Sequence, residues 1–483
     1  MTAQPPASDI DSDLQPSVRM ETTVASIPGE QARSQTRQVI DVVILVAVTV
    51  IITALIGVFS GEKLLFLEKE QLHLSPGQIG TLNILAALPA YLQPFMGAWS
   101  DLFPLFGYRR RSYYVIAALV ETLGFLGLAV LHPYHYAAVV GLILVYGAGG
   151  TLLWVMVNAV MVAVGNQTGT LPRLQSVRLF IPYILFIAFA ASLSGYVTQY
   201  WSYYSCFMVA ALLSFFRAPF ALLIDEKRMT GARHAHETDE EHRARLAAKQ
   251  AERARTAEAL RKAAATPGLW AMVGFVFYLI LTPGVYTAQI FYETDVLHFS
   301  KQFIGELGRY LYIGALLGVL LFGATSKRLP VRAMVWGAWI IDCVSYPILL
   351  YLHDPTSAKI VQLSTGFIGA LYTLGLWTLA AHASPPGIEG TVYGLVLGAI
   401  SLGGTLSEKI GGTLYDYFGP MNTAHHYSIA HGWVWAVWFG LIFTLIAVVF
   451  IPFLPDWTKS NEPIHASVEP EGGTAIEGGG LRE

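Results

Sequence analysis

The sequence predicts an all-α membrane protein in which twelve transmembrane helices form two six-helix bundles. Hydrophobic residues make up 54% of the 483-residue chain and charged residues 13%, which is about half the charged share of a soluble protein. The apolar residues gather in runs that reach the ~20 residues a helix needs to cross a bilayer. One charged stretch divides these runs into two sets of six. This composition excludes a soluble enzyme, and the net charge of −3 gives no general basic surface for nucleic acid.

Twelve apolar segments follow one another along the chain. The first six are 42–67, 78–100, 112–131, 137–162, 177–199 and 203–224, and the second six are 268–291, 302–324, 332–352, 359–381, 390–414 and 432–454. Each should be an α-helix, because lipid offers no partner to an unpaired backbone group. Five prolines fall inside the segments, where each removes a helix hydrogen bond and should produce a kink: Pro89, Pro94, Pro182, Pro283 and Pro347.

The polar stretches set the domain organisation. Residues 1–38 lack the apolar core of a signal peptide and are expected to be a disordered cytoplasmic tail. The N-terminal bundle is predicted over 39–224, a charged cytoplasmic linker over 225–266, the C-terminal bundle over 267–455, and a second disordered cytoplasmic tail over 456–483. The linker composition is typical of a solvated, partly helical tether.

Lysine and arginine are distributed unevenly among the connecting loops. With the N-terminus inside, the inner loops hold Arg109–Arg111, Arg173 and Lys327–Arg328, and the linker adds ten basic residues between Lys227 and Lys262. The outer connections hold few: Lys69, Lys301 and Lys359. Because positive charge favours the cytoplasmic side, both termini are predicted to be cytoplasmic, in the inner or plasma membrane of the cell.

The loop after the second segment carries the most specific motif. Asp101 ends the segment one turn after Gly97, and Gly107 precedes the cluster Arg109, Arg110 and Arg111. A carboxylate and an arginine cluster at a helix end can form charge-assisted pairs that hold one conformation and release in another. These six residues are therefore predicted to gate the inner side. The arginines alone would also fit a simple topology signal.

This segment resembles the inner loop of the major facilitator superfamily, and more narrowly that of the folate–biopterin transporter family. Ser100-Asp101, Pro104, Gly107-Tyr108 and Arg109–Arg111 match that family's loop, and Glu389-Gly390-Thr391 also resembles it. The resemblance implies the major facilitator fold, with spans 1, 4, 7 and 10 along a central cavity. The family usually has a lysine where this chain has Gln93. That difference leaves a muropeptide-type permease, or a non-transporting assembly factor of the same fold, as alternatives.

Ionisable residues at membrane depth are costly, so each is a functional candidate. Glu62 and Lys63 lie late in the first segment, where they either line a cavity or mark the membrane interface. Glu408 and Lys409 lie among small residues of the eleventh segment. Glu408 is expected to couple protons or contact the solute, with a buried ion pair as the alternative.

Further candidates allow both a structural and a functional interpretation. Glu306 and Arg309 can pair with each other or contact the solute, and Arg178 can bind an anion or anchor its helix. Glu121 lies near mid-membrane on a supporting span, where it serves packing or binds a proton. The uncharged candidates are Gln93 in the second segment, Asn158 in the fourth and Gln289 in the seventh.

The chain has neither a phosphate-binding Gly-x-x-x-x-Gly-Lys-Ser/Thr loop nor a His-Glu-x-x-His zinc motif. No cofactor, metal or enzymatic activity is therefore expected. A gradient must supply the energy, and the buried carboxylates favour protons. The predicted function is alternating-access secondary transport of a small organic solute, by resemblance folate- or pterin-like, in a monomer.

Overall fold

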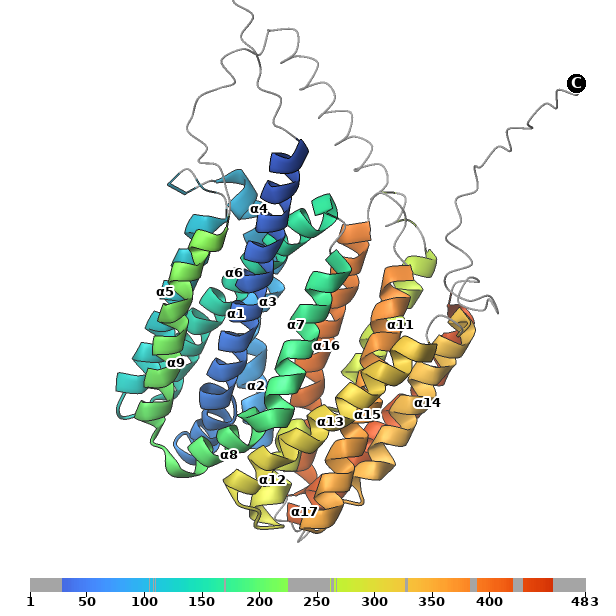
Figure 1. Ribbon diagram of the computed structural model, residues 1–483. Coiled ribbons are helices and arrows are strands. Elements are labelled where there is room, and N and C mark those ends of the chain that lie inside the picture. Colours follow the sequence, from blue (N-terminus) through green and yellow to red (C-terminus); the bar gives the residue numbers. More distant parts are fainter. Residues whose placement is uncertain are drawn as a thin grey trace, which may run out of the picture.

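The structure is a computed structural model, and nearly all of what it describes is helical (Figure 1). It describes residues 28–454 apart from 104, 107, 109, 169–170, 225–260, 262–264, 266, 326–328, 383–388 and 420–428. The predicted C-terminal tail and all but two residues of the predicted linker lie outside this part of the chain.

The N-terminal half contains helices at all six predicted segments. In chain order they are α1 (Pro28–Glu70), α2 (Pro76–Ala86), α3 (Leu88–Tyr91), α4 (Gln93–Leu102), α5 (Arg111–Val130), α6 (Tyr136–Thr168), α7 (Leu171–Leu185), the π-helix η1 (Phe186–Ala190), α8 (Ala191–Tyr200), α9 (Tyr203–Arg217) and the 3-10 helix η2 (Ala218–Leu223). Helix α1 begins at Pro28, inside the predicted tail. Pro28 suits a helix start, and nothing between Glu30 and Asp41 interrupts helical backbone.

The C-terminal half likewise contains helices at its six predicted segments. They are α11 (Pro267–Leu281), α12 (Tyr286–Asp295), α13 (Lys301–Thr325), α14 (Val331–Leu349), α15 (Pro355–His382), α16 (Glu389–Phe418), α17 (Ile429–Ile446) and the 3-10 helix η5 (Ala447–Phe453). Across the described residues, eight helices are long and apolar enough to cross a membrane. The fold is therefore an all-α membrane fold, and the number of twelve crossings stays a prediction.

Proline explains where the predicted spans are interrupted. Pro89 and Pro94 each stand in the first turn of a new helix, so the second span is divided into α2, α3 and α4. Pro283 lies in the break between α11 and α12. Pro182 lies inside α7, three residues before that helix passes into the π-helix η1. A missing N–H and the bulk of the proline ring account for each irregularity.

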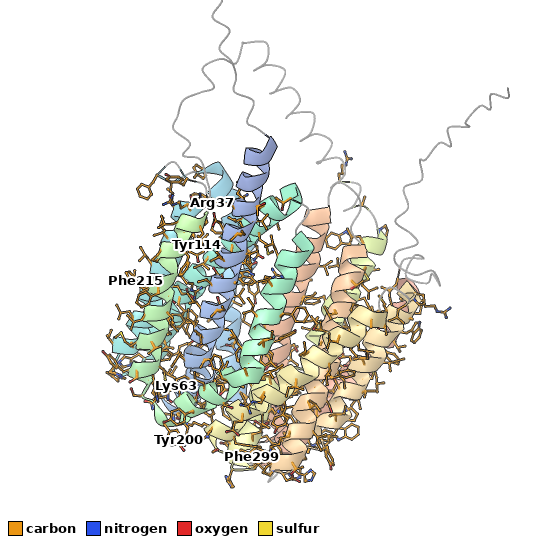
Figure 2. All side chains as sticks on the ribbon, in the orientation of Figure 1. Arg37, Lys63, Tyr114, Tyr200, Phe215 and Phe299 are labelled. Carbon is orange, nitrogen blue, oxygen red and sulfur yellow. The ribbon has the colours of Figure 1, made fainter. Side chains whose placement is uncertain are left out.

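Each half has a core of its own, and the two halves meet most extensively along two helix pairs. One N-terminal core surrounds Tyr114 and Met156, and a C-terminal core surrounds Phe275 and Leu376. Helix α2 packs on α16, and α8 packs on α13. Figure 2 labels Arg37 and Lys63 near opposite ends of α1. We call these the Arg37 end and the Lys63 end of the molecule.

Candidate functional site: a polar cavity between the halves

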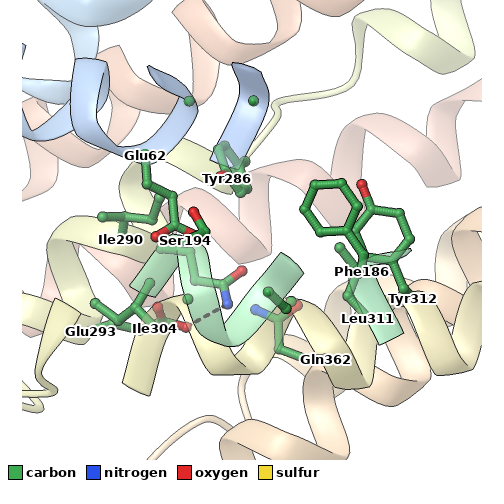
Figure 3. A pocket seen from close by; sticks show the side chains of 16 residues that line it. Glu62, Phe186, Ser194, Tyr286, Ile290, Glu293, Ile304, Leu311, Tyr312 and Gln362 are labelled. Atoms are coloured by element: carbon green, nitrogen blue, oxygen red, sulfur yellow. Dashed lines mark hydrogen bonds between the residues drawn. The ribbon is translucent and has the colours of Figure 1, made fainter. Parts of the chain in front are cut away.

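A cavity of about 230 Å³ lies between the two halves. Its walls come from α1, η1 and α8 of the N-terminal half and from α12, α13 and α15 of the C-terminal half. The polar side chains around it are Glu62, Ser194, Tyr286, Gln289, Glu293, Tyr312 and Gln362 (Figure 3). A cavity that both halves build changes its access when the halves move relative to each other.

Glu62 brings a carboxylate into this cavity from α1. Helix α1 presents Gly57 and Gly61 beside it, and a Cβ atom at either glycine would meet nothing within 4 Å. Glu62 Oε2 is buried and has no hydrogen-bond partner within the part of the chain that the structure describes. Burying a carboxylate oxygen without a hydrogen-bond partner costs free energy. Binding a proton, or accepting a hydrogen bond from a ligand, would remove that cost at Glu62.

Gln289 and Glu293 bring an amide and a second carboxylate from α12. They are four residues apart on one helix face, and Gln289 Nε2 donates to Glu293 Oε1 at 2.7 Å, the bond dashed in Figure 3. Both side chains are buried, with Glu293 only 1% exposed. Glu62 and Glu293 line the same cavity. The cavity thus combines two carboxylates, one from each half, with an amide.

Two ion pairs join the halves at the Lys63 end. Lys69 Nζ lies 2.5 Å from Asp295 Oδ1, and Lys301 Nζ lies 2.5 Å from Glu70 Oε1. Each lysine also lies over an aromatic ring: Lys69 is 4.2 Å from the centroid of Phe291, and Lys301 is 4.7 Å from that of Phe66. Both of these rings belong to the half opposite their lysine.

Backbone packing closes the same end. A Cβ atom at Gly305 of α13 would collide with the Cα atom of Gly195 in α8, so the two helices touch through their backbones. Glycine permits this close approach. The cavity is therefore separated from the Lys63 end by direct contact between the halves.

Side chain and backbone groups of α16 form hydrogen bonds with the segment between α11 and α12, where the seventh predicted span is interrupted. The Glu408 carboxylate accepts the backbone N–H groups of Tyr286 at 3.4 Å and Thr287 at 3.2 Å, which are unpaired donors at the N-terminus of α12. The Ser407 hydroxyl donates to the Thr282 carbonyl oxygen at 2.5 Å, and the Gly284 N–H donates to the Ser407 carbonyl oxygen at 2.9 Å. Glu408 therefore caps a helix of its own half and is not among the residues that line the polar cavity.

The next residues of α16 contact the other half. Lys409 Nζ donates to the carbonyl oxygen of Gly77 in α2 at 2.8 Å. Asp416 Oδ2 accepts the backbone N–H of Gly77 at 2.9 Å and the hydroxyl of Ser75 at 2.6 Å. A carboxylate at a helix N-terminus is favoured by the exposed N–H groups there. Asp416 thus caps α2 across the interface between the halves.

Two predicted candidates, Lys63 and Glu121, serve as structural ties inside the N-terminal half. Lys63 Nζ donates to the carbonyl oxygens of Thr198 at 3.0 Å and Trp201 at 2.5 Å, so it caps the C-terminus of α8. Glu121 Oε2 lies 2.8 Å from Arg217 Nη2 in a buried ion pair between α5 and α9.

Asn158 and Arg178 contact each other. Arg178 Nη1 donates to Asn158 Oδ1 at 2.6 Å, which joins α6 to α7, and Arg178 lies 5.3 Å from the ring centroid of Trp154. The polar cavity is not lined by either side chain.

Glu306 and Arg309 do not form the pair that their spacing allows. Glu306 accepts from Gln302 Nε2 at 3.3 Å, and Arg309 Nη2 donates across the interface to Ser192 Oγ at 2.5 Å. Arg309 turns instead to α8, which packs directly on α13. Gln93 begins α4 and is half-buried, away from the cavity lining.

The predicted gating loop lies at the end of the chain's second span. Arg110 Nη1 donates to the carbonyl oxygen of Ala159 at 3.0 Å, and Arg111 lies 5.3 Å from the ring centroid of Tyr108, both within the N-terminal half. Gly97 packs near Val155. Gly107, Arg109 and the side chain of Asp101 lie outside the described residues, so this gate stays a prediction.

Glu62 and Gln289 are cavity residues that the sequence singles out, whereas Glu293 and Asp416 are not among its candidates. The four-residue spacing from Gln289 would have put Glu293 on the same helix face. The apolar pattern ends the eleventh segment at residue 414 and so puts Asp416 in a loop, whereas α16 continues to Phe418.

Comparison with known proteins identifies a matching family model and several similar proteins. A model of the BT1 family matches residues 40–351 and 361–468. The folate-biopterin transporter of Synechocystis sp. is 28% identical over 377 residues, covering 74% of this chain and 72% of that protein. Folate transporter 1 of Plasmodium falciparum is 20% identical over 423 residues, covering 85% of this chain and 79% of that protein.

Two solved structures share the arrangement of helices. A mutant of the nucleoside transporter NupG superimposes with a TM-score of 0.63 at 13% identity, covering 85% of this chain and 100% of that one. The D-xylose-proton symporter superimposes with a TM-score of 0.62 at 14% identity, covering 88% and 100%. The family match together with the shared fold identifies a multi-pass membrane transporter with the major facilitator fold. Within that class the chain belongs to the BT1 family, the family of folate-biopterin transporters, as its inner-loop motif predicted.

Proposed function

We propose that this protein carries a pterin-class solute across the cell membrane by proton-coupled alternating access. The observation that supports this most directly is the meeting of Glu62, Gln289 and Glu293 in one cavity built by both halves. The central cavity is the solute site in this proposal, and Glu62 and Glu293 carry the coupled proton.

The cavity chemistry fits the edge of a pterin ring. That edge presents an amino group and a ring N–H side by side, and a carboxylate accepts two such parallel donors. The Gln289 amide supplies both a donor and an acceptor, and Tyr286 offers an aromatic face. The names of the relatives, which include folate and biopterin transporters, point to the same class of solute.

Carboxylates also suit proton coupling. Acidic residues inside membrane proteins serve as proton relays, and two of them around one small cavity repel each other when both are charged. A proton on Glu62 or Glu293 removes this repulsion. Solute and proton then bind to the same cavity, so the closed cavity carries both.

The orientation and oligomeric state belong to the same proposal. Arg37 marks one end of α1 (Figure 2), and the first turn of α5, which begins at Arg111 next to Arg110, packs in the same core as Val42 near that end. These basic residues support a cytoplasmic location for that end and for both termini. The Lys63 end then faces outward, and the closed contacts there support an inward-facing state. The transport cycle needs only the two halves of one chain, which supports a monomer.

Uptake by purified protein in proteoliposomes tests the proposal. We expect saturable uptake of a labelled pterin, stimulated by an inward-directed proton gradient and abolished when an ionophore dissipates that gradient. A panel that includes folates and muropeptides separates the solute classes. Uptake of a muropeptide in place of the pterins would contradict the solute assignment, uptake indifferent to the proton gradient would contradict the coupling, and a stable protein partner without any solute flux would favour an assembly factor.

A further inference from the structure

A second cavity of about 700 Å³ lies beside the polar one. Its walls come from α7 of the N-terminal half and from α13 and α15 of the C-terminal half. Most of the lining is apolar or aromatic, including Phe180, Tyr183, Leu311 and Val319, with two threonines as the other polar groups. This chemistry suits an uncharged aryl group and not a carboxylate.

The two cavities share a wall. Leu311 and Tyr312 of α13 line both of them. The polar cavity alone lies below the ~300–1,000 Å³ typical of small-molecule sites, whereas the second cavity falls within that range. An apolar cavity of about 150 Å³ is enough to hold benzene, so the second cavity has room for an aryl ring.

An aromatic pair from the two halves forms part of this wall. Figure 3 shows the rings of Phe186 and Tyr312 facing each other. They are stacked, with centroids 4.4 Å apart and an interplanar angle of 20°. Tyr183 lies on the other side of the wall, 5.7 Å from Tyr312. Phe186 begins the π-helix η1, and such an irregular turn shifts the following side chains relative to a regular helix. The chain departs from α-helical geometry where it presents Phe186 to the opposite half.

We propose that the apolar cavity is a second subsite, which binds the aryl segment of a ring conjugate whose polar ring occupies the cavity of Glu62 and Glu293. The inference rests on the proposed function and extends it. The Phe186–Tyr312 pair lies between the two subsites, so a conjugate that spans them displaces this stack and lies against Tyr312. The second subsite adds affinity for aryl-substituted pterins over bare pterins.

Glycines on the cavity walls allow a steric test. A Cβ atom at Gly369 of α15 would meet nothing within 4 Å, so Gly369→Leu fills the apolar cavity without a backbone clash. Gly61→Leu fills the polar cavity in the same way. Gly337→Leu on α14 is the matched control, because a Cβ atom there also meets nothing and Gly337 lines neither cavity.

Binding of two probes to the purified full-length protein distinguishes the outcomes. The probes are 6-methylpterin and 6-phenylpterin, which differ by an uncharged aryl ring. In Gly369→Leu we expect 6-phenylpterin affinity to fall at least tenfold, or about 1.4 kcal/mol, because the leucine side chain excludes the aryl ring, and 6-methylpterin affinity to change less than twofold. Gly61→Leu should weaken both probes, and Gly337→Leu neither.

The second subsite and the proposed function fail in different ways. If wild type binds both probes and Gly369→Leu changes neither, or weakens both equally, the second subsite is wrong and the pterin assignment stands. If wild type binds neither probe, the proposed solute class is wrong, and the proposed second subsite is then wrong as well.

Discussion

Asp416 of α16 accepts the backbone N–H of Gly77 in α2 at 2.9 Å, so a carboxylate of one half caps a helix of the other. Asp416 is buried, with 4% of its surface exposed. In the proposed cycle this contact is broken when the halves separate at the Lys63 end. Asp416 should therefore stabilise the closed state relative to the open one.

Asp416→Asn should favour opening of the Lys63 end. A charge-assisted hydrogen bond is roughly twice as strong as a neutral one, so the variant loses about 0.7–1.5 kcal/mol and shifts the ratio of open to closed molecules about 3- to 10-fold. The measurement is labelling of a cysteine placed at Gly61, in a background without Cys206 and Cys343, by an impermeant thiol reagent added at the Lys63 end. Asp354→Asn, which removes a carboxylate within the C-terminal half, is the control. Equal labelling of the Asp416 and Asp354 variants would show that Asp416 does not help to keep the Lys63 end closed.

A charge exchange tests the pair Lys69–Asp295. Reversing either residue alone should raise labelling from the Lys63 end, because like charges would then face each other across the halves. The double variant Lys69→Asp with Asp295→Lys should restore low labelling. Both side chains are partly exposed, at 15% and 35%, so the pair contributes about 0.2–1 kcal/mol and the effect should not exceed about fivefold. If the double variant labels like the single variants, the charges are not the reason for closure.

Gly305→Ala should prevent full closure of the Lys63 end. The added Cβ atom would collide with the backbone of Gly195, which no side-chain rotation relieves. We expect slower transport and stronger labelling from that end, with a cost to the closed state of about 1–3 kcal/mol. Gly308→Ala, one turn along the same helix, places its Cβ atom at an ordinary 3.6 Å from Ala191 and is the control. Normal transport and labelling by Gly305→Ala would show that this close contact does not determine closure of the Lys63 end.

Glu121→Ala should destabilise the protein without a specific effect on coupling. It leaves Arg217, which is 1% exposed, as an unpaired buried charge, and losing one partner of such a pair costs about 3–5 kcal/mol. Thermal unfolding of the purified protein measures this. The double variant Glu121→Leu with Arg217→Met should recover most of the stability and transport with the wild-type response to pH. A double variant that is stable but no longer responds to a proton gradient would instead assign Glu121 to coupling.

The cap of α15 should give a pH-dependent contribution to stability. The backbone N–H of Ser357, followed by that of Thr356, donates to the Asp354 carboxylate and holds the pKa of Asp354 below its usual range. A lowered pKa in the folded state means that the stabilisation is complete above the ordinary aspartate pKa of about 3.9 and is lost as the pH falls below it. The difference in melting temperature between wild type and Asp354→Ala should therefore shrink as the pH falls from about 6 to about 3. A difference that stays constant would show that the charge contributes nothing.

Hydrophobic runs and prolines predicted most of the fold. Every predicted segment contains helix, and Pro89, Pro94 and Pro283 lie where spans break, since both signals are local in the sequence. Glu62 and Gln289 could be proposed as cavity residues because a polar group in an apolar run stands out. The partners of Glu408 and Asp416 could not be predicted, because they are backbone N–H groups of distant helices and every residue except proline has one. Nor could the Lys69–Asp295 pair, which joins residues 226 positions apart.

Glu408 and Lys409 are neighbours in the chain, but Glu408 contacts its own half and Lys409 contacts the other half. The two amides that Glu408 caps, those of Tyr286 and Thr287, lie within its own half, whereas Lys409 and Asp416 hold Gly77 of the other. In the proposed cycle, the amide of Thr287 should stay protected from hydrogen exchange, whereas the amide of Gly77 should lose its protection whenever the halves separate at the Lys63 end. Exchange at Gly77, with Thr287 as the internal reference, would then report opening of that end.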